Sequence, residues 1–219
     1  MRRKNLAFWI QPAPSGHLGV FPDQASHWDW LAQLIEAAPA PPKALSLFGY
    51  TGLATLAAAA AGAQVTHVDA SRQAVKWARE NQSLSQLADR PIHWIVEDAQ
   101  TFVAREIRRG RTCDGLILDP PRFGRGPRGE LWKVEESLPV LLRQCRKLLA
   151  QHPRFVLLNT YTTVFTRDQT AREALQLRSL LEEMLAGCSV SLTSGEIVLA
   201  DHAGRQISNS VFARASAIL

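Results

Sequence analysis

The chain has 219 residues, 46% hydrophobic and 21% charged, a composition typical of one globular domain with a full core. Its formal net charge of +5 favours nucleic acid or another polyanion only weakly, because many basic proteins bind neither. The three cysteines are too few and too widely spaced for a disulfide framework or a zinc site, and the six histidines show no metal spacing. We therefore expect a protein without a metal, in the reducing cytoplasm.

Two apolar stretches could be mistaken for targeting or membrane segments. Residues 6–10 are too few for the apolar core of a signal peptide, and the alanine-rich run over 53–63 is too short to cross a bilayer. We therefore expect no membrane partner. The sequence leaves the oligomeric state open.

Residues 1–42 are expected to form an N-terminal arm that ends in a helix. The helix is predicted over 24–38, with Asp23 as its cap and the prolines at 39, 41 and 42 beyond its end. The remaining residues, 43–219, are expected to form the main domain.

From residue 43 onward, apolar strands alternate with helices. Strands are predicted at 44–48, 65–68, 92–96, 115–118 and 155–158, and helices after Thr51 and at 71–82, 100–109, 134–149 and 168–185. This alternation predicts a parallel sheet with helices on both faces. Short strands expected at 189–193, 195–199 and 210–215 predict an antiparallel C-terminal end.

The segment with the most chemistry follows the strand at 115–118. The apolar run stops at Asp119, two prolines follow, and a loop over 122–129 holds three arginines, three glycines and Phe123. Because proline lacks a backbone N–H, the strand ends there, and the loop leaves the edge of the sheet where open α/β folds bind ligands. A carboxylate, rigid carbonyls, an aromatic ring and arginines together suggest a reaction on a nucleic-acid base.

Three earlier strands also end in groups suited to a ligand. The turn over 47–52 contains two glycines and precedes a helix, whose N-terminus offers free N–H groups. Asp69 is either an acid that binds ribose hydroxyls or a helix cap, and Asp98 either accepts from an adenine amino group or caps a helix. Four such features on consecutive strands are far more specific than any one of them.

Together these motifs resemble the class I S-adenosylmethionine-dependent methyltransferases, and more narrowly the large-subunit ribosomal RNA methyltransferase family that includes the cytosine-5 enzymes. The matching segments are 47–52, 67–71, 97–99 and 119–123, preceded by the similar segment 19–24. The resemblance covers roughly residues 16–215. It implies a Rossmann-like fold with a mostly parallel seven-stranded sheet, helices on both faces and an antiparallel C-terminal end.

The resemblance also implies a site, with S-adenosylmethionine as cofactor. The residues that would hold the cofactor are Phe48, Gly49, Tyr50, Thr51 and Gly52 at the methionine part, Asp69, Ala70 and Ser71 at the ribose, Asp98 and Ala99 at adenine, and Phe21 and Gln24 in an arm that closes over it. Methyl transfer would occur beside Asp119, Pro120, Pro121 and Phe123. The substrate would contact Arg122, Arg125, Arg128, Asn159 and Tyr161.

The chain departs from the family pattern in two places. Ser46 stands where many members carry an acid that helps to hold the methionine end. Only the short arm stands where the relatives usually carry an RNA-binding domain. The Asp-Pro-Pro turn also resembles the one used by amino-methylating enzymes. Phe123 follows Arg122 and so comes one position later than their usual aromatic residue, and it either stacks on a base or anchors its loop.

The cysteines argue against methylation at carbon 5 of a pyrimidine, which needs a cysteine to add to the ring first. The strand at 155–158 continues into 159–163 without one, and Cys113 lies six residues before Asp119, roughly 20 Å along an extended chain. Cys145 falls inside a predicted helix and Cys188 beyond the last one, so all three are interpreted as buried thiols. The predicted acceptor is therefore a nitrogen or an oxygen atom.

The leading prediction is a methyltransferase of RNA, with ribosomal RNA first among the substrates. One alternative is a methyltransferase for a small molecule or a protein, and another is a non-catalytic module that binds S-adenosylmethionine or RNA. A nicotinamide oxidoreductase is disfavoured by the absence of G-x-G-x-x-G. A second arginine cluster, over 105–111, is interpreted as solvated surface.

Overall fold

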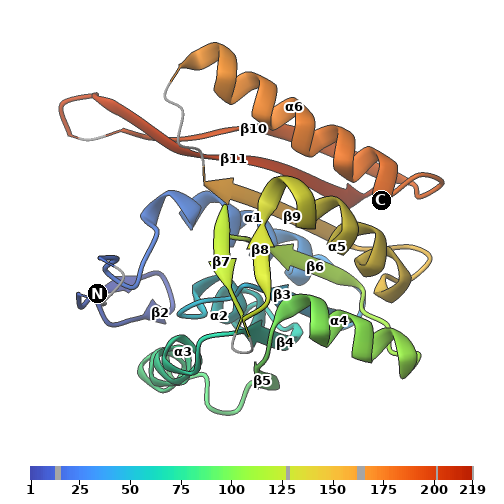
Figure 1. Cartoon of the computed structure of the whole chain (residues 1–219). Coiled ribbons are helices and arrows are strands. Elements are labelled where there is room, and N and C mark those ends of the chain that lie inside the picture. The colour runs from blue at the N-terminus through green and yellow to red at the C-terminus, as the bar shows by residue number, and fades with distance from the viewer. Residues whose placement is uncertain (13–15, 127–128, 162–165, 201, 219) are drawn as a thin grey trace.

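A seven-stranded sheet runs through the centre of the computed structural model, which describes residues 1–12, 16–126, 129–161, 166–200 and 202–218 (Figure 1). The strand order is β10-β11-β9-β6-β3-β4-β5. Five strands are parallel: β3 (Lys43–Leu47), β4 (Gln64–Asp69), β5 (Ile92–Val96), β6 (Gly115–Leu118) and β9 (Phe155–Tyr161). At the C-terminal end, β11 (Gln206–Ala217) pairs antiparallel with β9, and β10 (Val190–Ala200) pairs antiparallel with β11. The predicted fold class is confirmed.

Helices cover both faces of the sheet because its central strands are apolar on both sides. On one face lie α1 (Ala25–Glu36) and α2 (Leu53–Ala60), with α3 (Arg72–Leu84) beside α2; on the other lie α4 (Ala99–Arg108), α5 (Val134–Leu148) and α6 (Arg167–Met184). Along β6, Leu116 and Leu118 join the core under α4, α5 and α6, while Ile117 joins the core under α1 and α2. Alternate residues of one strand thus hold the two layers together.

The C-terminal strands differ from the prediction. Two long strands, β10 and β11, replace the three short ones, because the expected turn near Gly195 is an uninterrupted part of β10. Gly195 pairs with Phe212 in the ladder between β10 and β11. A Cβ added to Gly195 would lie 3.5 Å from the Phe212 ring. The aromatic ring therefore covers the glycine, and the strand continues.

The segment after Asp119 also differs from the prediction of a loop. It forms an antiparallel hairpin of β7 (Phe123–Arg125) and β8 (Leu131–Lys133). Strand β9 extends three residues beyond the predicted end, so that Asn159 and Tyr161 are strand residues. Apart from β9 and the C-terminal strands, the predicted elements agree with the structure to within two residues.

The N-terminal arm contains more structure than the sequence indicates. A short hairpin of β1 (Arg2–Arg3) and β2 (Leu6–Ala7) comes first, and a 3-10 turn, η1 (Pro22–Gln24), precedes α1. The prediction that Asp23 caps the helix is wrong, because Asp23 lies inside η1 and accepts a hydrogen bond from Ser210 of β11. The division of the chain at residue 42 stays a prediction. In the part of the chain that the structure covers, no helix is long and apolar enough to span a bilayer.

Candidate functional site

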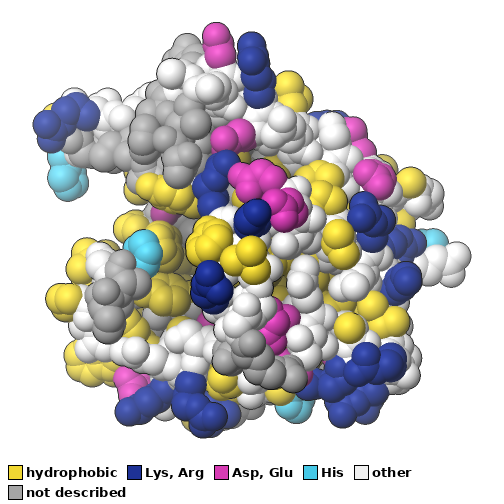
Figure 2. All heavy atoms as spheres, viewed as in Figure 1, with side chains coloured by type: hydrophobic (Ala, Val, Ile, Leu, Met, Phe, Trp, Pro, Cys, Tyr) yellow, Lys and Arg dark blue, Asp and Glu magenta, His cyan; other side chains and the backbone are white. Residues whose placement is uncertain are grey.

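The carboxyl ends of the five parallel strands meet at one edge of the sheet, and a cavity of about 830 Å³ opens there. Figure 2 shows the hollow on this face, between the N-terminal arm on the left and the β7–β8 hairpin in the centre. A cavity of this size falls within the range of pockets that bind small molecules and cofactors.

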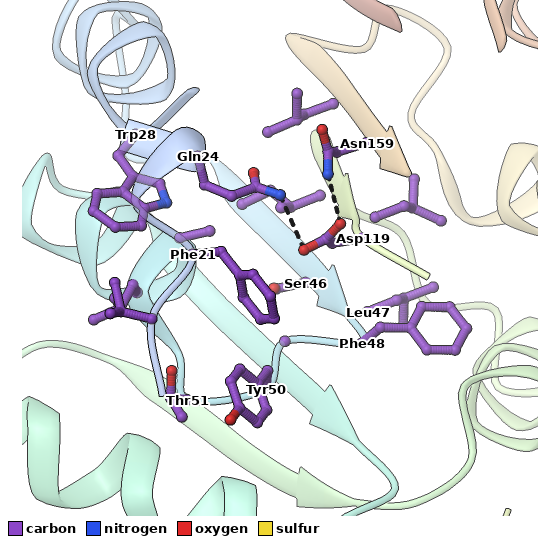
Figure 3. A pocket seen from close by; sticks show the side chains of 17 residues that line it. Phe21, Gln24, Trp28, Ser46, Leu47, Phe48, Tyr50, Thr51, Asp119 and Asn159 are labelled. Atoms are coloured by element: carbon purple, nitrogen blue, oxygen red, sulfur yellow. Dashed lines mark hydrogen bonds between the residues drawn. The ribbon is translucent and has the colours of Figure 1, made fainter. Parts of the chain in front are cut away.

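Most of the residues predicted for the site line this cavity. They are Phe21, Gln24, Phe48, Tyr50, Asp69, Ala70, Ser71, Asp98, Ala99, Asp119, Pro120, Pro121, Arg122, Arg125, Asn159 and Tyr161. Gly49 and Thr51 line a smaller adjoining cavity of about 50 Å³, shown in Figure 3, together with Ser46. Gly52 lines neither cavity, and Arg128 lies outside the described residues.

The turn between β3 and α2 has an unusual backbone. Phe48 and Tyr50 have φ angles of 57° and 49°, in the left-handed region that non-glycine residues rarely adopt. A Cβ on Gly49 would lie 2.3 Å from the ring of His67, so this turn rests directly on the buried imidazole. Such strain persists where the surrounding structure over-determines it, as it often does at ligand sites.

Asp69 braces this turn from the tip of β4. Its Oδ2 accepts a hydrogen bond from the Tyr50 N–H at 2.9 Å, and its Oδ1 accepts one from the Ser71 N–H at 2.8 Å. The alternative that Asp69 caps the next helix is wrong, because Ser71 is the cap and accepts from Ala74 N–H. Burial raises the pKa of Asp69, and the two N–H groups counteract that rise.

Asp98 caps a helix, which confirms one of its two alternatives, and it also lines the cavity, while its contact with adenine stays a prediction. It caps α4 by accepting a hydrogen bond from the Thr101 N–H at 2.8 Å through Oδ1. It also lines the cavity, together with Ala99, the first residue of α4. The capping bond therefore fixes the direction in which a cavity-lining carboxylate is presented.

Asp119 receives two amide hydrogen bonds (Figure 3). The side chain of Gln24 donates to Oδ2 at 3.1 Å, and that of Asn159 donates to Oδ1 at 2.7 Å. Burial raises the pKa of Asp119 to about 6; the Asn159 hydrogen bond opposes that rise, nearby Asp23 adds to it, and Gln24 opposes it. The two amides therefore favour the ionised form that burial disfavours.

The N-terminal arm is fastened over this edge of the sheet by two buried contacts. The Thr51 hydroxyl donates to the carbonyl of Gly19 at 2.7 Å, and the Ser210 hydroxyl donates to Asp23 at 2.5 Å. Between these contacts the Phe21 ring packs against Tyr50, with ring centres 5.8 Å apart. The arm is thus one wall of the cavity.

The aromatic ring beside the Asp-Pro-Pro turn is Trp132 rather than Phe123. Phe123 does not line the cavity and is 59% exposed, so the alternative that it anchors the loop in the core is wrong. Trp132 is 5% exposed, lines the cavity, donates its indole N–H to the Pro121 carbonyl at 2.6 Å and packs against Phe48. The sequence predicted only a core position for Trp132, because its contact with Pro121 depends on the β7–β8 hairpin, which the sequence did not predict.

Arg122 and Arg125, which follow Pro121, differ in whether nearby carboxylates neutralise their charge. Arg122 donates to the carboxylates of Glu135 at 2.8 Å and Glu173 at 3.3 Å, so its charge is largely matched. Arg125 is exposed and borders the cavity. Of this pair, Arg125 is therefore the better placed to meet a phosphate.

None of the three cysteines lines the cavity. Cys113 and Cys145 are buried in the core around α5, and burial raises the pKa of the Cys113 thiol to about 12 and that of Cys145 further. Cys188 is only half-buried, which corrects the interpretation that all three are buried. Among the described residues, no three His, Cys, Asp or Glu side chains gather as metal ligands would.

Several known proteins similar to this chain are described as methyltransferases. A solved structure described as a SAM-dependent methyltransferase from Agrobacterium tumefaciens is 42% identical and superimposes with a TM-score of 0.88, over 97% of this chain and 67% of that one. The ribosomal RNA large subunit methyltransferases K/L of Aeromonas hydrophila and Vibrio cholerae are 29% and 31% identical, over 78% and 62% of this chain. The chain spans only 23% and 19% of their lengths. No protein-family model matches the chain.

Proposed function

The chain belongs to the class I S-adenosylmethionine-dependent methyltransferases, and from this membership we propose that it methylates RNA, ribosomal RNA first, at a nitrogen or oxygen atom in the cytoplasm. The observation that carries the proposal is the cavity that gathers Asp69, Asp98 and Asp119 at one edge of the sheet without a cysteine. The similar Aeromonas and Vibrio proteins, named for ribosomal RNA, support the choice of substrate.

The residues around the cavity suit S-adenosylmethionine. The carboxylates of Asp69 and Asp98 can accept hydrogen bonds from ribose hydroxyls and an adenine amino group. Leu53 and Ala54, the first residues of α2, line the smaller cavity, where a helix N-terminus favours a carboxylate such as that of the methionine part. We therefore propose that the N-terminus of α2 holds the methionine part, because Ser46 stands where many family members carry an acid for this purpose.

The bound cofactor supplies a methyl group that its sulfonium sulfur has already activated. The protein's task is then to align the acceptor and to exclude water, rather than to provide a strong catalyst. We assign alignment to Asp119, Pro120 and Pro121, with Trp132 fixing the Pro121 carbonyl. Arg125 would meet the RNA backbone, and Asn159 and Tyr161 would border the acceptor.

The nature of the acceptor follows from the nucleophiles that are missing from the cavity. A nitrogen or oxygen lone pair can attack the methyl group directly, whereas carbon 5 of a pyrimidine needs a cysteine adduct first. The nearest candidate by sequence, Cys113, lies two residues before β6, whereas Asp119 directly follows that strand, and burial keeps the Cys113 thiol protonated. Methylation at carbon 5 is therefore disfavoured.

Two measurements test the proposal. Calorimetry with S-adenosylhomocysteine should show binding by the wild-type protein, no binding of NAD, and at least tenfold weaker S-adenosylhomocysteine binding by Asp69→Ala. Methyl transfer from labelled S-adenosylmethionine to ribosomal RNA from cells lacking the protein, followed by mass spectrometry of nucleosides, should identify a product methylated on nitrogen or oxygen. Asp119→Ala should lower turnover more than cofactor affinity.

The exposed acid Asp89 does not line the cavity, and its change to alanine, which removes the same charge, serves as the control. Heat with NAD but not with S-adenosylhomocysteine would contradict the proposal, as would a 5-methylpyrimidine product. Labelling of a small molecule or a protein in place of RNA would contradict the proposed RNA substrate but would still support methyl transfer as the reaction.

A further inference from the structure

The two amides that hold Asp119 come from opposite sides of the cavity. Gln24 ends η1 in the N-terminal arm, 95 residues before Asp119, and Asn159 lies in β9, 40 residues after it. Both are buried, with 9% and 2% of their surface exposed. In Figure 3 the carboxylate lies between them, and each amide reaches a different oxygen. Two separate parts of the fold thus converge on one side chain.

Both amides are held in place by rigid structure. Asn159 lies in β9, one residue beyond the end of the pairing with β6, and its partner in the ladder with β11 is Phe212. Gln24 follows Asp23, which is tied to β11 through the Ser210 hydroxyl. Since both supports end on β11, the two donors keep a fixed separation that matches the two oxygens of one carboxylate.

We propose that Gln24 and Asn159 are positioning residues for methyl transfer, an amide clamp that fixes the Asp119 carboxylate as an anion and orients its remaining lone pairs toward the acceptor. The inference rests on the proposed function and assigns the residues that hold its central carboxylate in place. A carboxylate offers about four lone-pair sites, and the clamp uses two of them.

Other charged groups near Asp119 do not supply the same stabilisation. Asp23 on η1 opposes ionisation of Asp119. On α1, His27 is neutral near pH 7, because burial and then Arg214 of β11 lower its pKa to about 4. The charge of Arg122 is directed to Glu135 of α5 and Glu173 of α6. The neutral amides are thus the groups that favour the anion.

The clamp is tested with Gln24→Met and Asn159→Leu, which keep side-chain size and remove the donor. The pKa of Asp119 is read from its carboxyl ¹³C resonance, assigned by its disappearance in Asp119→Asn, in protein labelled at aspartate. We expect that pKa to rise by about one unit in each variant, because each variant removes one hydrogen bond to the charged form of Asp119. Gln33→Met, an exposed amide on α1, is the matched control and should leave it unchanged.

Turnover provides the second measurement. In both variants the acidic limb of the pH profile of kcat should move upward by the same one unit, so that turnover lost near pH 7 is largely recovered at pH 8.5. A structural defect alone would lower kcat at every pH. If Asn159→Leu does not fold, as judged by its amide NMR spectrum, Asn159→Ala replaces it.

An unchanged Asp119 titration in the folded variants overturns the clamp, and so does a loss of turnover that does not depend on pH. Failure of the proposed function is distinguishable from either result, because the carboxyl titration needs no substrate. A shifted titration in a protein that transfers no methyl group to RNA would support the clamp and contradict the RNA substrate.

Discussion

At the scale of single residues, the site is built from carboxylates whose oxygens are already partly used. Asp69 accepts two backbone N–H groups, Asp98 accepts one, and Asp119 accepts two amides. Each bond fixes the direction in which the remaining lone pairs point. Orientation of this kind favours precise alignment of a donor and an acceptor, which is what methyl transfer requires.

Gly49 is expected to be essential for stability because no side chain fits at that position. In Gly49→Ala the new Cβ would lie 2.3 Å from the ring of His67, which is fully buried in β4 and has no room to move away. We expect a loss of about 1 to 3 kcal/mol in the free energy of unfolding, measured by chemical denaturation. Gly195→Ala, whose Cβ would meet Phe212 at an ordinary 3.5 Å, is the control. Equal stability of the two variants would contradict the prediction.

At the scale of elements, the β7–β8 hairpin connects the Asp-Pro-Pro turn to the core. Trp132 of β8 turns back under Pro121 and also packs against Phe48, which begins the turn after β3. One side chain therefore links the segment expected to meet the acceptor with the segment expected to hold the methyl donor.

Trp132→Phe should separate these two roles. The smaller ring can still pack against Phe48, but it cannot donate to the Pro121 carbonyl, so the Asp-Pro-Pro turn loses one constraint. We expect kcat for methyl transfer to fall roughly three- to tenfold, for a loss of about 1 kcal/mol of alignment, with S-adenosylhomocysteine affinity within about twofold. Trp30→Phe, which changes a tryptophan packed on Phe155 in the other core, should alter neither quantity. Unchanged kcat in Trp132→Phe would argue against the role.

At the scale of the whole molecule, buried histidines make stability depend on pH. Burial lowers the pKa of His67 to about 3, while the unfolded chain titrates near 6.5. Between these values the unfolded state binds the proton and the folded state does not, so the stability that His67 contributes is present above pH 6.5 and is lost as pH falls. Asp119 acts in the opposite direction, because its raised pKa stabilises the fold as pH falls below about 6.

His67→Gln should therefore make the free energy of unfolding depend less on pH. The glutamine can still reach the Thr55 hydroxyl, which the His67 ring contacts at 2.9 Å, but it takes up no proton. We expect the variant to lose about 1.4 kcal/mol less per pH unit than the wild type between pH 6.5 and 4, measured by urea denaturation. His93→Gln, an exposed histidine on the neighbouring strand β5, is the control. Parallel profiles for His67→Gln and the wild type would show that His67 titrates normally.

The net charge of the whole molecule should set how strongly RNA affinity depends on salt concentration. With a net charge of +5 and the charge of Arg122 matched by carboxylates, we expect few phosphate contacts and a shallow dependence of affinity on salt. Arg125→Ala should reduce the slope of log affinity against log salt by about one. Arg108→Ala, an exposed arginine of α4 that does not line the cavity, should leave the slope unchanged. A slope equally reduced in both variants would mean that binding is not centred on the cavity.

The sequence by itself determined the sheet and the ligand edge. Apolar strands that alternate with helices can form only a parallel sheet covered on both sides, and the carboxyl ends of such strands share one edge. Asp69, Asp98 and Asp119 could therefore be assigned to one cavity from their places at strand ends alone. The sequence also predicted that no cysteine lies at that edge, because the residues that directly follow each predicted strand include none.

Tertiary structure decided what surrounds those carboxylates. The Gln24–Asp119 bond spans 95 residues and the Ser210–Asp23 bond spans 187, and no local pattern signals a hydrogen bond between such distant residues. Trp132 replaced Phe123 as the aromatic residue of the site because a hairpin, rather than a loop, follows the prolines. Local sequence sets where a strand ends and which group it presents, whereas packing among remote segments sets which partners hold that group and in what charge state.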